Sequence, residues 1–180
     1  MKPEIKLAVF VVVALLTWGG IFLVYRHSQN PQRKARSLAE KALYATVENP
    51  ERIKVLAVSK ADSIYGREYV TMEEQMNIAK SMMNVNREVM KATNGFENIN
   101  LTDKRVTSLM ERQMDAMSAM RSLVHPGKIV EHTKKNFTGW KVKIDYQAQT
   151  TDGLQYRSEC WMFLDRDASC VVKSFEIPII

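Results

Sequence analysis

The hydrophobic pattern of the chain begins with one long apolar run and then breaks into short periodic stretches. Residues 7–25 form a run of 19 uncharged residues bounded by Lys6 and Arg26. As a helix rising about 1.5 Å per residue, the run would span roughly 28 Å, close to the hydrocarbon core of a bilayer. No small-residue cleavage site and no cysteine follow it. The run therefore predicts an uncleaved single-pass membrane anchor, with a cleaved signal peptide as the alternative.

Three later stretches carry apolar residues at the three- and four-residue spacing that is typical of a helix. The first is predicted between Asn30 and Asn49, because Asn-Pro pairs both open and stop it. The second opens with a capping box formed by Thr71 and Glu74 and is expected to close at Gly95.

The third helical stretch is expected to follow Thr102 and Asp103 and to end at the His-Pro-Gly sequence of residues 125–127. Nine of the eleven methionines lie in the second and third stretches, between residues 72 and 120. Because they share their stripes with Val, Ile and Leu, packing in the core is the favoured interpretation. The alternative is a pliable groove for a helix, peptide or apolar ligand. Its candidate residues are Met83, Met90, Met114 and Met117.

The remaining pattern has a period of two or is rich in β-branched residues, and it predicts strands. Strands are expected at 53–59, 65–70, 128–133, 140–148, 154–164 and 169–177. Residues 60–63 and 165–168 are expected to be turns, and the Asp-Gly pair at 152–153 predicts a two-residue hairpin. We expect the final residues, 175–180, to be either an edge strand protected by its proline or a docking element.

A two-residue turn would fix the register of the central hairpin. It places Tyr146 opposite Glu159 and Ile144 opposite Trp161, so that one sheet face takes both methionine-rich helices. The prediction is an α+β fold, in which a curved antiparallel sheet packs on long helices. The expected organisation is a tail (1–6), a transmembrane helix (7–25), a basic juxtamembrane segment with an amphipathic helix (26–49) and an α+β domain (50–180).

This order of elements resembles the cone-shaped cystatin-like and NTF2-like folds. With a membrane anchor in front, it also resembles inner-membrane assembly factors of type IV secretion and conjugation machines. The resemblance rests on element order alone and carries over no functional residue. The helix pair lies in mid-chain here, whereas NTF2-like domains usually begin with their helices. What the resemblance implies is a role in assembling an envelope complex.

The net charge of +6 is concentrated at the N-terminal end. Residues 1–36 contain six basic residues and one acidic residue. Residues 37–180 contain 20 basic and 19 acidic residues. A nearly neutral domain argues against a nucleic-acid partner. The basic cluster instead predicts contact with lipid headgroups through Arg26, Arg33, Lys34 and Arg36. The positive-inside rule slightly favours a cytoplasmic domain. The short tail before residues 7–25 favours export, and we expect the domain to be extracytoplasmic, which is periplasmic in a bacterium.

Few residues could carry catalysis. Two cysteines and three histidines exclude a disulfide scaffold and a four-cysteine zinc site, no known catalytic motif is present, and neither a metal nor a cofactor is expected. The predicted last hairpin keeps Cys160 and Cys170 out of disulfide reach, so both are expected to be free. His132 could form an acid–base site with Glu159 and Tyr146, although a solvated rim is the simpler interpretation.

The sequence therefore predicts a membrane-anchored, non-catalytic protein whose domain mediates protein–protein contacts, including those of a homo-oligomer. One alternative is a small-ligand or lipid-binding cone, for which Tyr146, Glu159 and Trp161 are the candidate residues. An isomerase-like or dehydratase-like enzyme is the other alternative.

Overall fold

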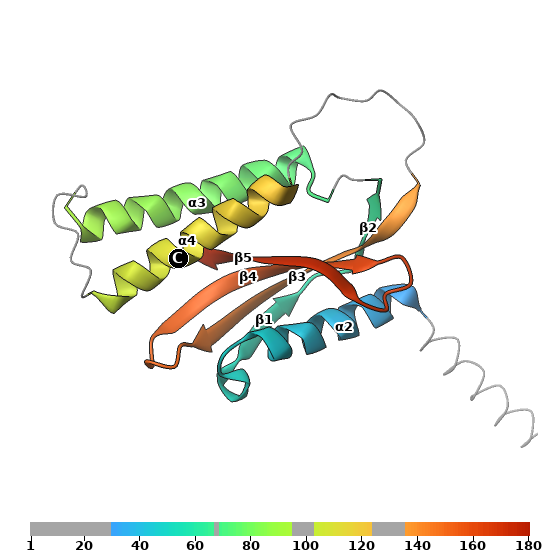
Figure 1. The fold of residues 1–180 in the computed structure, drawn as a ribbon, viewed down its shortest axis with the longest axis horizontal. Helices are drawn as coiled ribbons and strands as arrows, with labels where there is room; N and C mark the ends of the chain where they lie inside the picture. Colours follow the sequence, from blue (N-terminus) through green and yellow to red (C-terminus); the bar gives the residue numbers. More distant parts are fainter. Residues whose placement is uncertain (1–29, 67–68, 95–102, 124–135) are drawn as a thin grey trace, which may run out of the picture.

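The described part of the protein is an α+β fold with a curved antiparallel sheet and three long helices, as predicted (Figure 1). The computed structural model describes residues 30–66, 69–94, 103–123 and 136–180. Its helices are α2 (Pro31–Thr46), the 3₁₀ turn η1 (Pro50–Arg52), α3 (Met72–Ala92) and α4 (Lys104–Leu123). Its strands are β1 (Lys54–Val58), β2 (Asp62–Tyr65), β3 (Phe137–Gln149), β4 (Gln155–Asp165) and β5 (Val171–Ile179).

Strand β3 organises the five-stranded sheet. The order is β1-β3-β4-β5, and β2 pairs with the part of β3 that β1 leaves open. All pairs are antiparallel. The predicted strand at 53–59 is confirmed, but its successor starts earlier than the predicted 65–70. The reason is Ile64, which is buried on the side of the sheet that α3 covers, while its neighbours Ser63 and Tyr65 pair with β3.

The predicted register of the β3–β4 hairpin is wrong by one residue. Tyr146 lies opposite Ser158, and Ile144 lies opposite Cys160. The turn has three residues, 151–153, because Thr150 and Leu154 still pair through a backbone hydrogen bond of 2.9 Å. Gly153 adopts a φ of 86°, which suits the left-handed position of such a turn. The extra residue turns every side chain of β4 to the opposite face.

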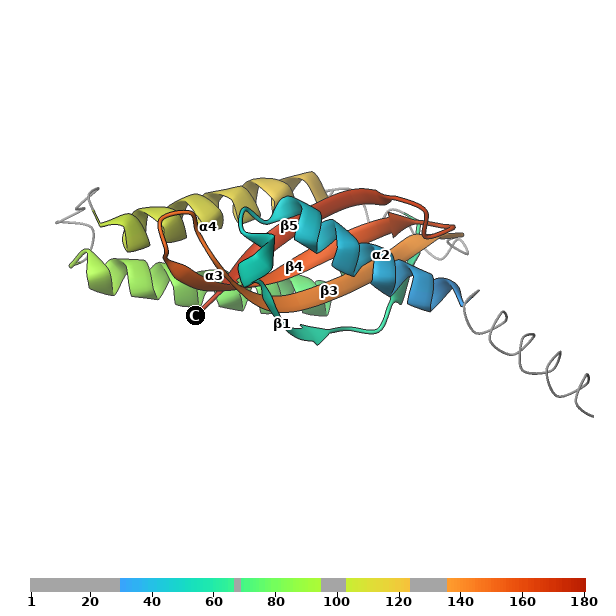
Figure 2. The same cartoon turned by 90° about the horizontal axis from the view of Figure 1, so that it is seen from below.

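Helices lie on both sides of the sheet, α2 on one side and α3 with α4 on the other (Figure 1 and Figure 2). Each side has its own apolar core. On one face, Trp140, Val142, Ile144 and Tyr146 belong to a core that includes α2. The small side chains of α2 at this contact allow it to approach the sheet closely. On the other face, Trp161 and its neighbours belong to a second core with α3 and α4; these neighbours are Ile64, Val70, Ile78, Phe163, Phe175 and Ile177.

One face of the sheet does take both methionine-rich helices, as expected, but it is the face that carries Trp161, whereas Ile144 and Tyr146 lie on the face covered by α2. Ile144 and Trp161, which the predicted register placed opposite each other, lie in different cores. The described fold also includes α2, whose Ala35, Ala39 and Leu43 are completely buried or nearly so.

The predicted helix starts are confirmed where they can be seen. The amide of Gln32 donates to Asn30, Thr71 and Glu74 form the capping box, and Asp103 accepts from two amides at the start of α4. The last strand is confirmed as an edge strand that contains its proline. Several predictions lie outside the described residues, namely the anchor at 7–25, the strand at 128–133, the cap at Thr102 and the helix ends at Gly95 and 125–127. Within the described residues, no helix combines the length and the apolar character needed to cross a bilayer.

Candidate functional site

The most unusual surface of the described structure is a set of exposed methionines on α3 and α4. Their exposed fractions range from 43% to 72%. We call them the methionine face, and its members are Met72, Met76, Met83, Met90, Met114 and Met117. The interpretation that methionines fill the core is therefore wrong for these six. All four methionines singled out from the sequence belong to this face.

The two rows of methionines border one line, along which α3 meets α4. The two helices run antiparallel beside each other (Figure 1). At their contact, the side-chain amide of Gln113 donates to the backbone carbonyl of Met82, and the Met82 side chain is half-buried. Met83 directly follows Met82 on α3, and Met114 directly follows Gln113 on α4. One residue along a helix with 3.6 residues per turn is a rotation of about 100° around its axis. In antiparallel neighbours on one sheet, that step leads outward on both helices, so both rows lie on the outer side of the helix pair.

The row on α3 has the spacing of a coiled-coil seam. Its residues recur at alternating intervals of four and three, and all six are exposed: Met72, Met76, Ala79, Met83, Asn86 and Met90. A strict interval of this kind is the pattern with which one helix packs on another. The residues that anchor α3 to the sheet, Ile78, Val85 and Val89, lie on a different stripe. Helix α3 thus has one apolar stripe for its own fold and one that its fold does not use.

A buried ionic cluster holds the start of α3 on the sheet. Lys141 donates to Glu74 at 2.5 Å, Lys143 donates to the same carboxylate at 3.3 Å, and the Lys143 ammonium lies 4.9 Å from the ring centre of Trp161. Burial raises the pKa of Glu74, but the hydrogen bond and charge of Lys141 outweigh it and hold the pKa below its ordinary value. Both lysines are held by the one carboxylate of Glu74, so the cluster is a structural element.

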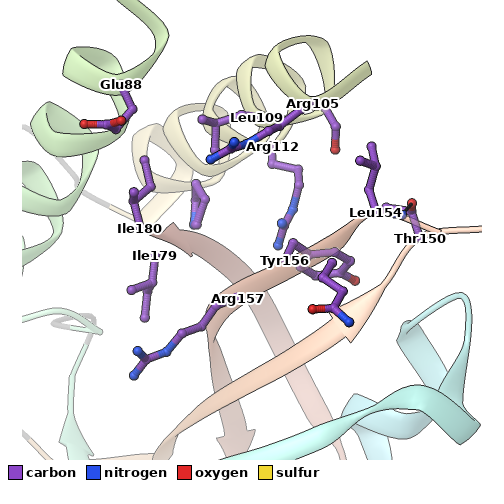
Figure 3. A pocket seen from close by; sticks show the side chains of 13 residues that line it. Glu88, Arg105, Leu109, Arg112, Thr150, Leu154, Tyr156, Arg157, Ile179 and Ile180 are labelled. Atoms are coloured by element: carbon purple, nitrogen blue, oxygen red, sulfur yellow. Dashed lines mark hydrogen bonds between the residues drawn. The ribbon is translucent and has the colours of Figure 1, made fainter. Parts of the chain in front are cut away.

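A second polar cluster joins α4 to the sheet beside a small hollow (Figure 3). The Arg112 side chain points from α4 toward the sheet, where it contacts Ser158 and the ring of Tyr156 on β4 and Glu176 on β5. The hollow next to it has a volume of about 200 Å³. That is below the usual range for small-molecule sites, which begins near roughly 300 Å³. Sequence reasoning missed this cluster, because no local pattern links residues so far apart in the chain.

The structure does not bring Tyr146 and Glu159 together. Tyr146 is completely buried on the α2 side, where burial and the charge of Glu176 raise the pKa of its hydroxyl. Glu159 lies on the opposite face, because it alternates with Ser158 and Cys160 along β4. Its carboxylate accepts a hydrogen bond of 2.7 Å from the indole of Trp161, which is itself buried. His132 lies outside the described residues.

Two of the predicted membrane-surface residues line a second hollow. Arg33 and Lys34 border it on α2, whereas Arg36 does not and Arg26 lies outside the described residues. No group of histidine, cysteine or carboxylate side chains in the described residues could hold a metal ion. Both cysteines are free, with Cys160 buried and Cys170 exposed.

Comparison with known proteins adds no relative: no protein-family profile, curated protein or solved structure matches this chain. The function is therefore inferred from the fold and the surfaces of this chain.

Proposed function

We propose that this protein is a non-catalytic, membrane-anchored interaction domain that binds a second copy of itself through the methionine face. The observation that carries the proposal is the unused seam on α3. Six large apolar side chains at 43–72% exposure form a larger apolar surface than a folded domain needs for itself. Methionine also suits a protein-binding surface, because its flexible thioether adapts to the opposing side chains.

A second copy fits the seam in an antiparallel arrangement. Met72 then lies opposite Met90 of the other copy. Met76 and Met83 lie opposite its smaller residues Asn86 and Ala79, respectively. In the same register, Glu73 of each copy approaches Arg87 of the other, which gives two opposite-charge pairs. Lys80 of one copy approaches Lys80 of the other, which gives one like-charge pair. Two opposite-charge pairs outweigh one like-charge pair. Anchoring both copies through residues 7–25 would raise their effective concentration and favour the contact.

The test is the oligomeric state of the full chain in detergent micelles, measured by light scattering coupled to size exclusion. The variant M76E/M83E is expected to be monomeric and folded, because both side chains are at least 66% exposed. Burying a methionine completely is worth about 1.5–3 kcal/mol. About two-thirds of each of these side chains is still exposed, so losing four across the two copies costs at least about 4 kcal/mol and weakens association roughly 1,000-fold. The matched control, V172E, introduces a charge at an exposed apolar residue of β5 and should still associate.

Charge reversal tests the register. Glu73 and Arg87 are 14 positions apart on one helix, about 21 Å, so they cannot pair within a copy. E73R and R87E should each weaken association, and the double variant should restore it. A wild-type chain that stays monomeric, or a double variant weaker than both single ones, would overturn the proposal.

We also propose that the domain is extracytoplasmic, which is the setting expected of an envelope-assembly protein. A phosphatase reporter that is active only after export, fused behind Ile180, tests it. Activity of a cytoplasm-only reporter at the same position would contradict it.

A further inference from the structure

The second hollow lies between the first turns of α2 and the turn that joins β4 to β5. It has a volume of about 560 Å³ and is open to solvent. Its lining residues are Arg33, Lys34, Ser37, Leu38, Lys41, Ala168 and Ser169. Three of these seven side chains are cations, and two carry hydroxyl groups.

The cations are arranged to surround one anionic group. Arg33, Ser37 and Lys41 follow one another at intervals of four residues, so they form a straight row along α2. Within the described part of the chain, neither the guanidinium of Arg33 nor the ammonium of Lys41 forms a hydrogen bond or an ion pair, although the Arg33 backbone amide donates to Asn30. Lys34 is held at the rim, because its ammonium donates to the backbone carbonyl of Asp167 at 3.0 Å.

The acidic side chains of the opposite turn, Asp165 and Asp167, do not line the hollow. The Asp165 carboxylate is occupied by the hydroxyl and amide of Ser169 and by the amide of Cys170. These hydrogen bonds, with a smaller effect from Lys34, lower the pKa of Asp165. The carboxylate therefore braces the turn, and the row on α2 presents its cations to the hollow.

The position of the hollow in the chain suggests what fills it. Arg33 lies only eight positions after Tyr25, the last residue of the apolar run. Even fully extended, these positions span at most about 29 Å. If residues 7–25 cross a bilayer, α2 must therefore begin close to the headgroups. A hydroxyl between two unpaired cations then suits a phosphate, which accepts hydrogen bonds from both kinds of group.

We propose that this hollow binds the phosphate of an anionic phospholipid headgroup and so fixes how the domain sits on the membrane. The inference rests on the proposed membrane anchor. It goes beyond general attraction of basic residues to lipid, because it assigns the contact to Arg33, Ser37 and Lys41 around one phosphate. Arg36, which is equally basic and adjacent in sequence, takes no part in it.

Cys170 is a built-in reporter for this site. It is exposed and directly follows Ser169 in the wall of the hollow, whereas Cys160 is buried. A neutral maleimide should therefore modify Cys170 first, and a bound headgroup should slow that reaction. The experiment uses the full chain in nanodiscs of phosphatidylcholine, with or without phosphatidylglycerol, and follows modification by intact mass.

Two cations at an anionic surface favour the bound state by about 30-fold, so phosphatidylglycerol should slow modification of Cys170 by at least about threefold. The variant R33E/K41E should lose this protection. The control K54E/K60E changes the net charge equally at two exposed lysines before β2, away from the hollow, and should keep it. Equal protection in both double variants would reduce the effect to surface charge and overturn the proposal.

Two further measurements complete the test. One identifies the source of the phosphate, and the other tests the membrane anchor independently. Millimolar inorganic phosphate added to phosphatidylcholine nanodiscs should leave modification unchanged. If it protects Cys170 as well as the lipid does, the hollow is a site for a soluble phosphate compound and the lipid assignment is wrong. Flotation of the wild-type chain with neutral vesicles tests the anchor independently. Flotation without protection by phosphatidylglycerol refutes the headgroup site alone, and failure to float refutes the anchor on which it rests.

Discussion

Replacing Glu74 by alanine is expected to destabilise the protein by about 4 kcal/mol, because it leaves a buried lysine without its counter-charge. The side chain of Lys141 is only 7% exposed, and that of Glu74 is 14% exposed. Removing one partner of a buried ion pair costs roughly 3–5 kcal/mol. Glu74 also accepts a hydrogen bond of 2.9 Å from the amide of Thr71, and losing such a cap costs about 1 kcal/mol. The partly exposed Lys143 can turn to water, so it adds little.

Two further variants separate these contributions. E74Q keeps an oxygen for the Thr71 amide but loses the charge, so it should cost about 3 kcal/mol. K141M should cost less than about 1.5 kcal/mol, because an apolar side chain can replace the stem while Glu74 keeps Lys143 and the cap. The order of destabilisation is therefore expected to be E74A, then E74Q, then K141M.

The assay is urea-induced unfolding of the full chain in micelles, followed by the fluorescence of Trp161 and the other tryptophans. E111A, at an exposed glutamate of α4, is the control and should change stability by less than about 0.5 kcal/mol. Because the pKa of Glu74 is lowered in the folded state, its stabilisation is complete above the ordinary value of 4.5 and is lost as the pH falls through the lowered value. E74Q should lack this acid-dependent loss. If E74A unfolds at the same urea concentration as E111A, the reasoning about the buried pair is refuted.

Three other predictions concern the sheet and its edges. R112A should cost about 3 kcal/mol in the same urea assay by leaving Glu176 and Ser158 unpaired, and R112K should not fully restore stability because lysine lacks the planar fork that reaches both groups. N-ethylmaleimide at pH 8 should modify Cys170 but not Cys160 in the folded chain, because burial and the charge of Glu176 raise the pKa of Cys160 to about 12; equal modification of both, detected by peptide mass spectrometry, would contradict the buried position. G139A should destabilise by more than about 3 kcal/mol, because its Cβ would overlap the backbone carbonyl of Leu164 across the β3–β4 pair; a chain that melts within a few degrees of wild type in circular dichroism would show that β4 can shift.

Local signals explain which parts of the fold the sequence could predict. Asn30, the pair Thr71 and Glu74, and Asp103 cap their helices through side chains two or three residues away, so the pattern contains the whole interaction. The alternation over β3 is equally local. The register was not predictable from the Asp-Gly pair, because two- and three-residue turns both accept glycine at that place. The difference is decided by which faces of β4 find partners on distant helices.

The methionine face shows a similar limit. Helical spacing revealed apolar stripes on α3, but a helix with two stripes does not indicate which one faces the sheet. Val85 and Val89 take that position, and the methionines remain outside. The hollow beside α2 depends on a turn more than 120 residues away in sequence, so Arg33 and Lys34 could be identified as basic but not as walls of a site.

The pairing of β3 with both β1 and β2 has a consequence for how the chain is made. Residues 54–65 emerge from the ribosome well before their partner strand at 137–149, and the whole of α3 and α4 lies between them. A sheet with such distant partners cannot nucleate while the chain is short, since each pairing must first close a long loop. The early strands thus wait unpaired until β3 and β4 arrive. Folding should therefore begin only after the last third of the chain has been synthesised, and truncation before β4 should leave the chain without its sheet.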